Sequence, residues 1–89
     1  MIMQGRLRHI MIRLTQIKKD KNNISCLALV EDCTIPFKLI YNIMSEEIQP
    51  YELPKSYEHC KSHIAHARRE LERISKEEIL PQERLIMWY

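Results

Sequence analysis

The chain has 89 residues, of which 45% are hydrophobic and 29% charged, and its formal net charge is +2. A chain of this length buries only about 60% of its unfolded surface, so we expect one core and little room for a deep catalytic cleft. No window approaches the ~18 consecutive apolar residues of a membrane span. Arginines interrupt the apolar N-terminal run, which argues against a signal peptide. The short chain and the absence of a membrane-spanning run favour a small binding module, with no membrane partner.

Cysteine and glycine usage narrows the classes of function further. Cys26, Cys33 and Cys60 are an odd number of widely spaced cysteines, so we expect free thiols and a cytoplasmic location. The one glycine, Gly5, leaves no phosphate-binding loop or dinucleotide fingerprint. Neither Gly-x-Ser-x-Gly nor Cys-x-x-Cys occurs. The sequence therefore predicts no enzyme, no catalytic residue, no cofactor and no small-molecule substrate.

Alternation of apolar and polar residues, the period of a β-strand, predicts four strands. The first covers residues 10–17 and the second residues 24–30, which are apolar on both faces and therefore indicate a central strand. Residues 35–43 give the clearest alternation. Residues 48–53 contain Pro50, which cannot donate a ladder hydrogen bond, so this fourth strand belongs at an edge.

The second half of the chain predicts a helix. Ser56 is a candidate N-cap, and Pro81 lies beyond the end of the helical pattern. Between them an apolar stripe recurs at spacings of three and four, formed by Tyr57, Cys60, Ile64, Ala67, Leu71 and Ile74. We expect this stripe, and Ile64 and Leu71 in particular, to pack on the sheet; pairing with the helix of a second chain is the alternative.

Together these elements predict one α+β domain over residues 10–89, preceded by a poorly ordered extension over residues 1–9. An antiparallel sheet of about four strands packs against one long C-terminal helix. A final short strand or extended segment follows, because an apolar run would not stay free in water. That run consists of Leu85, Ile86, Met87, Trp88 and Tyr89, and we expect it to be ordered, with Trp88 at least half buried.

Three histidines on the helix raise the question of a metal site. His59, His63 and His66 fall within an arc of about 60°, but they spread over ~10 Å of helix axis. Zinc–nitrogen bonds are only ~2.0–2.1 Å long. We therefore expect these histidines to hold no metal in the isolated monomer, although a metal bridging two copies of the helix stays open. Cys26, Cys33 and Cys60 could form a Cys₃His site with His63, but small buried hydrophobic residues are the preferred interpretation.

Charge is distributed unevenly along the chain. Residues 1–23 carry six basic side chains against one acidic, whereas residues 24–54 carry one basic side chain against five acidic. Pairing of opposite charges between neighbouring strands is the preferred explanation, and a basic patch for an anionic partner is the alternative. The helix also carries a basic row, but glutamates interrupt it at i,i+4 spacing. The residues of the nucleic-acid alternative are Arg6, Arg8, Arg13, Lys18, Lys19, Lys21, Arg68 and Arg69.

The segment from Tyr51 to Arg69, together with the terminal Met87-Trp88-Tyr89, resembles short uncharacterised proteins carried by bacterial phages and mobile elements. The resemblance covers residues 35–89 at most and implies no functional residue and no activity. It implies an accessory protein that acts on a host protein. We therefore expect a non-enzymatic interaction module that binds another protein or itself, with residues 85–89 as candidate contacts. A nucleic-acid-binding accessory protein is the alternative.

Overall fold

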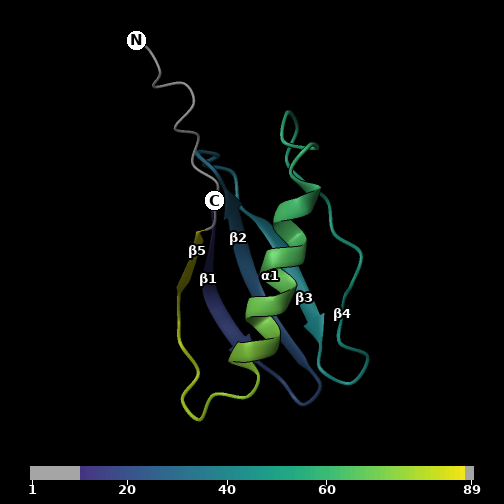
Figure 1. The fold of residues 1–89 in the computed structure, drawn as a ribbon, viewed down its shortest axis with the longest axis vertical. Coiled ribbons are helices and arrows are strands. Elements are labelled where there is room, and N and C mark those ends of the chain that lie inside the picture. The colour runs from purple at the N-terminus through teal and green to yellow at the C-terminus, as the bar shows by residue number, and fades with distance from the viewer. Residues whose placement is uncertain (1–10, 88–89) are drawn as a thin grey trace.

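The computed structural model describes residues 11–87 and contains one antiparallel sheet and one helix (Figure 1). The elements are β1 (Met11–Lys19), β2 (Asn23–Val30), β3 (Phe37–Asn42), β4 (Glu47–Ile48), α1 (Lys61–Ile74) and β5 (Arg84–Met87). The strands lie in the order β4-β3-β2-β1-β5, and each neighbouring pair is antiparallel. The α+β class and the central position of β2 are as the sequence predicts.

The four strands before the helix form a meander, and the chain then returns to the opposite edge of the sheet. Strand β5 pairs with β1, with Ile86 opposite Ile12. The predicted docking of the apolar C-terminal run is therefore confirmed as far as Met87. Trp88, Tyr89 and the predicted extension over residues 1–9 lie outside the described residues.

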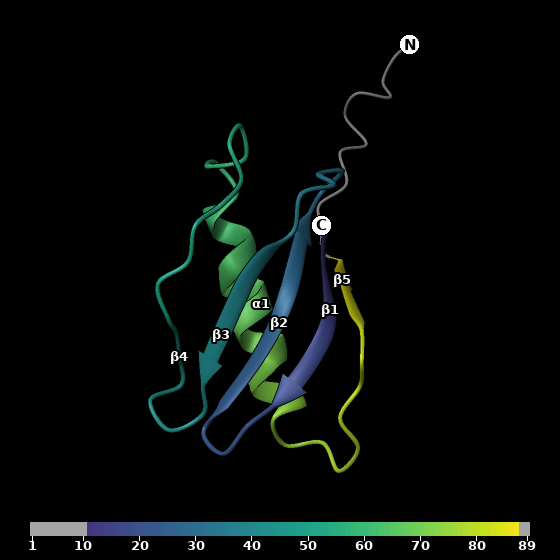
Figure 2. The same ribbon diagram turned by 180° about the vertical axis from the view of Figure 1, so that it is seen from behind.

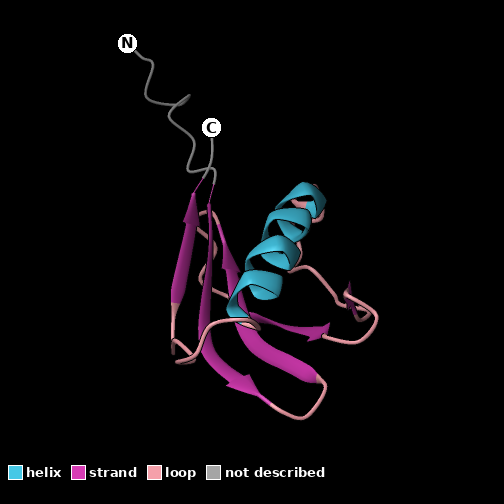
Figure 3. Cartoon of the chain, turned by 60° about the horizontal axis from the view of Figure 1, so that its bottom comes forward, coloured by secondary structure: helices cyan, strands magenta, loops and turns pink. Residues whose placement is uncertain are grey.

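The helix covers one face of the sheet, and the core lies between the two layers. Figure 2 shows the sheet in front of α1, and Figure 3 shows the same two layers from the end of the molecule. Ile64 and Leu71 are buried as predicted, in one cluster with Phe37, Leu39 and Tyr41 of β3. Burying side chains of this size contributes about 1.5–3 kcal/mol each, which makes this cluster the main stabilising feature of the fold.

The helix is shorter than predicted and begins later in the sequence. It spans 14 residues from Lys61, and Cys60 occupies the N-cap position without a capping side-chain hydrogen bond. Ser56 has φ 76°, in the left-handed region, whereas an N-cap residue needs extended backbone. The prediction that Ser56 caps the helix is therefore wrong. The helix is also not C-terminal, because the loop to β5 and β5 itself follow it.

Two predicted strand boundaries are also wrong. The third strand begins at Phe37, and Ile35 is 63% exposed in the preceding loop. The fourth strand contains only Glu47–Ile48. Pro36 and Pro50 explain both differences, because each lacks the backbone N–H that would extend the ladder. Within residues 11–87, no helix combines the length and the apolar character that crossing a bilayer requires.

Candidate functional site

The face of the sheet opposite α1 is covered by no other described element, and we call it the open face (Figure 2). Strand alternation and the cross-strand register assign its side chains. Six of them are apolar, three are basic, two carry small hydroxyls, two are asparagines and one is acidic. They are Met11, Leu27, Leu29, Ile40, Leu85 and Met87; Arg13, Lys18 and Lys38; Thr15 and Ser25; Asn23 and Asn42; and Glu47.

The register places each of two cations beside apolar side chains. Arg13 lies opposite Leu29 on one side and opposite Leu85 on the other. Lys38 lies opposite Leu27. Side chains directly opposite each other on antiparallel strands have Cβ atoms about 5 Å apart, so these groups form one continuous mixed surface.

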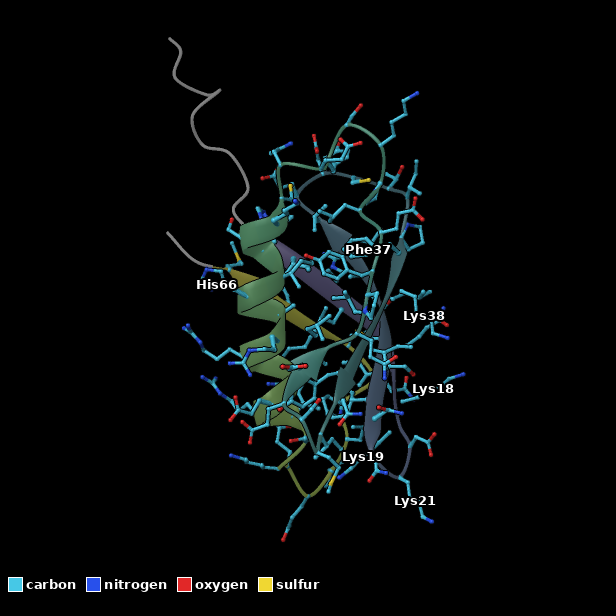
Figure 4. All side chains as sticks on the ribbon, turned by 90° about the vertical axis from the view of Figure 1, so that its right-hand side faces the viewer. Lys18, Lys19, Lys21, Phe37, Lys38 and His66 are labelled. Carbon is cyan, nitrogen blue, oxygen red and sulfur yellow. The ribbon has the colours of Figure 1, made fainter. Side chains whose placement is uncertain are left out.

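A β-bulge in β1 brings the third cation to the same face. The register shifts between Thr15 and Lys18, and Gln16 has φ 51°. As a result Ile17 stays buried in the core while Lys18 lies opposite Ser25. Lys18 and Lys38 both project away from the helix in Figure 4, and they line an open hollow of about 270 Å³.

The cations of the open face do not pair with acidic side chains across the strands. Arg13 faces two leucines and Lys18 faces a serine, and Arg13, Lys18 and Lys38 are all exposed. The preferred sequence interpretation, that neighbouring strands pair opposite charges, is therefore wrong for the described pairs of β1 with β2. Arg13 instead lines an open hollow together with Glu31 and Asp32, the residues that follow β2.

The other predicted basic residues do not join this face. Lys19 reaches back to the end of the helix, where its Nζ donates to the Ser75 carbonyl at 3.3 Å. Lys21 lies in the turn after β1 (Figure 4). Arg68 forms an ion pair with Glu72 at 3.3 Å. Because Arg68 belongs to α1, it lies in the helix layer and away from the open face.

Arg69 is exposed on the helix, and Arg6 and Arg8 lie outside the described residues. Lys38 is a further basic residue of this face and is not among the predicted ones. Alternation could have found it, because Phe37 and Leu39 point into the core and Lys38 must point the other way.

The predicted contact residues at the C-terminus divide between the two faces. Leu85 and Met87 lie on the open face and are 46% and 55% exposed. Ile86 packs against the core instead. Strand β5 therefore supplies two exposed apolar side chains to the edge of the open face.

The three histidines differ in burial and in their contacts. His59 is exposed and its ring stacks on Tyr57 with centroids 6.2 Å apart, and His66 is half-buried. His63 is buried, and its Nε2 lies 3.2 Å from a carboxylate oxygen of Glu31. Burial lowers the pKa of His63, and the opposing effect of Glu31 does not overcome it. His63 therefore belongs to a contact between α1 and Glu31, the residue that follows β2.

All three cysteines are buried. Cys26 points into the core from β2, and burial raises the pKa of its thiol to about 12. Cys33 lies in the loop after β2, where its sulfur accepts a hydrogen bond from the Ile35 amide at 3.4 Å. Both behave as small buried side chains, as the sequence analysis expects. Cys60 lies beside His63.

The fold and this surface define a small two-layer α+β protein with one covered and one open sheet face. Comparisons with protein-family models, with curated proteins and with solved structures gave no match.

Proposed function

We propose that the protein is a small non-enzymatic interaction module that binds another protein through the open face. The observation that supports the proposal is the combination of six apolar side chains with three exposed cations on an uncovered sheet. Protein surfaces that leave contiguous apolar area uncovered commonly serve as binding sites. Complementarity of charge then favours a partner segment that carries apolar residues flanked by Asp or Glu.

Pairing of two copies through this face is disfavoured by charge. A symmetric contact would bring Arg13, Lys18 and Lys38 of one chain against the same residues of the other. Like charges placed together at an interface cost several kcal/mol. A different protein is therefore the better occupant.

Nucleic acid remains the second candidate, because Arg13, Lys18 and Lys38 could contact phosphates. Sheets that bind single strands usually add aromatic side chains on which bases stack. Among the described residues of the open face, none is aromatic. The leucines, isoleucine and methionines fit a protein surface better.

The resemblance to proteins of phages and mobile elements supports a host protein as the partner, and we retain that as part of the proposal. The small number and wide spacing of the cysteines fit a reducing compartment, which supports the cytoplasm as the place of action.

A selection from a displayed random-peptide library against the purified protein tests the proposal. We expect enriched peptides that combine apolar residues with Asp or Glu. Their binding should be lost in the double variant Arg13→Glu with Lys38→Glu. The matched control is Arg69→Glu, which reverses an exposed charge on the helix and should leave binding unchanged.

Enriched peptides whose binding survives the double variant would contradict the proposal. So would a chemical-shift map that places the peptide on α1. Parallel fluorescence-anisotropy titrations with a generic oligonucleotide at about 50 mM salt test the second candidate. Oligonucleotide binding that the double variant abolishes, in the absence of any peptide binding, would make nucleic acid the partner.

A further inference from the structure

Three side chains with metal-binding atoms converge where the end of β2 meets the start of α1. They are Glu31, Cys60 and His63, and their ligand atoms all lie within 4.8 Å of one another. In a tetrahedral zinc site with bonds of ~2.0–2.3 Å, ligand atoms are ~3.3–3.8 Å apart. The Glu31 oxygen and the His63 Nε2 are already 3.2 Å apart. The spacing of the three ligand atoms is therefore close to the spacing that one bound ion requires.

These three groups are shielded from water. Cys60 is fully buried and His63 is 6% exposed, and the side chain of Glu31 is 16% exposed. Burying charged and polar groups together is costly unless they pair or bind a metal.

The backbone holds the three residues in this arrangement. Glu31 has φ 51°, a left-handed conformation that costs a non-glycine residue about 1–2 kcal/mol. This turn of the backbone ends the alternation of side chains between the two faces of β2. The Glu31 carboxylate then reaches His63 on the helix side of the sheet. Cys60 and His63 are one helical turn apart, and the His63 amide donates to the Cys60 carbonyl at 3.0 Å. The i,i+3 spacing puts both side chains on the same side of the helix start.

We propose that Glu31, Cys60 and His63 form a binding site for one zinc-like divalent transition-metal ion, with water in the fourth position. A thiolate, an imidazole and a carboxylate are the donor set that zinc accepts, and they suit hard ions such as Mg²⁺ poorly. The ion would join the loop after β2 to the helix. The proposal departs from the expectation that no helical histidine holds a metal in the monomer, because His63 is a ligand here. It does not need His59 or His66 to share the ion.

Calorimetric titration of the full chain with Zn²⁺ tests the proposal, using tag-free, chelator-treated protein at neutral pH under a thiol-free reductant. We expect one ion per chain and a rise in the melting temperature, because a ligand that binds only the folded state stabilises it. Cys60→Ser, His63→Gln and Glu31→Gln should each weaken zinc binding by about tenfold or more. His66→Gln is the matched control, because it removes a helical imidazole outside the cluster, and it should leave the affinity unchanged.

Cobalt supplies a readout that does not depend on the variants folding. Co²⁺ added to the parent protein should produce the near-ultraviolet charge-transfer absorption of a cobalt–thiolate bond, and Zn²⁺ should displace it. No zinc binding at ~100 μM Zn²⁺, a concentration far above the dissociation constant expected of a protein site, would overturn the proposal. Binding without the thiolate band would overturn it too. Half an ion per chain, lost in His66→Gln, would instead show a metal bridging two helices.

Discussion

The phenol of Tyr57 donates a hydrogen bond to the Asp32 carboxylate, with 2.9 Å between oxygens, and so joins the loop after β2 to the segment before α1. These residues are 25 positions apart in the sequence. The bond holds together the two segments that supply Glu31 and Cys60. It also raises the pKa of Tyr57, because the ionised phenolate could no longer donate. The start of the helix is therefore fixed by a tertiary contact, since no side chain caps it.

We predict that Tyr57→Phe lowers the melting temperature at neutral pH. The folded-state pKa of Tyr57 lies above its ordinary value of 10.0, so its stabilising contribution is fully present below pH 10.0 and is lost as the pH rises through the raised value. The difference in melting temperature between parent and variant should therefore shrink in alkaline solution. Thermal melts from neutral to alkaline pH measure it. Tyr51→Phe is the control, and equal losses in both variants would contradict the role of Asp32.

Leu71→Ala should destabilise the protein by about 2–5 kcal/mol, because Leu71 is fully buried between α1 and the sheet and its truncation leaves a cavity. Chemical denaturation gives the change in the free energy of unfolding. Ile79→Ala removes a side chain that is 83% exposed and should change it by less than about 0.5 kcal/mol. An unchanged unfolding midpoint in Leu71→Ala would mean that the helix does not pack on the sheet in solution.

Arg84→Met should weaken the attachment of β5 to the rest of the fold. The guanidinium of Arg84 contacts Glu70 at 2.7 Å and Glu77 at 2.9 Å, which fastens the edge strand to the helix and the loop after it. Because these groups are partly exposed, we expect a loss of about 1 kcal/mol. Amide hydrogen exchange in β5 should become faster.

The matched control for Arg84 is Arg73→Met. Arg73 contacts the same Glu70 at 3.6 Å, but its side chain is 69% exposed and it belongs to α1 and not to β5. Its replacement should leave exchange in β5 unchanged. Equal exchange rates in the parent and in Arg84→Met would show that strand pairing alone holds β5 in place.

Cys26 should resist alkylation in the folded protein. Burial raises the pKa of its thiol to about 12, so the reactive thiolate is scarce at mildly alkaline pH. Peptide mass spectrometry after iodoacetamide treatment should find Cys26 unmodified in native protein and modified in denaturant. Modification of native Cys26 at the rate of a free thiol would contradict its place in the core.

Local patterns in the sequence were enough to predict much of the fold. Strand alternation identified β1, β2 and β3, and helical periodicity identified Ile64 and Leu71 as core residues. These predictions succeed because burying one face of an element requires a regular spacing of apolar residues. The same rule placed the apolar C-terminal run on the sheet, as β5 confirms through Met87.

Element ends were less predictable, because they depend on backbone geometry and long-range contacts. Ser56 looked like a helix cap, yet its positive φ excludes that role. Gln16 gave no sign of the bulge that brings Lys18 to the open face. Both depend on how the neighbouring strands and loops pack.

The sequence by itself determined the fold class and much of the core, because periodicity and hydrophobicity are local properties of the chain. Only the tertiary structure decided which side chains meet. Arg68 and Arg69 lie on the helix, in the other layer from Arg13, while Glu31 reaches His63 across 32 positions of sequence. Such contacts follow from how the helix lies across the sheet and from the backbone turn at Glu31, and no local spacing records either.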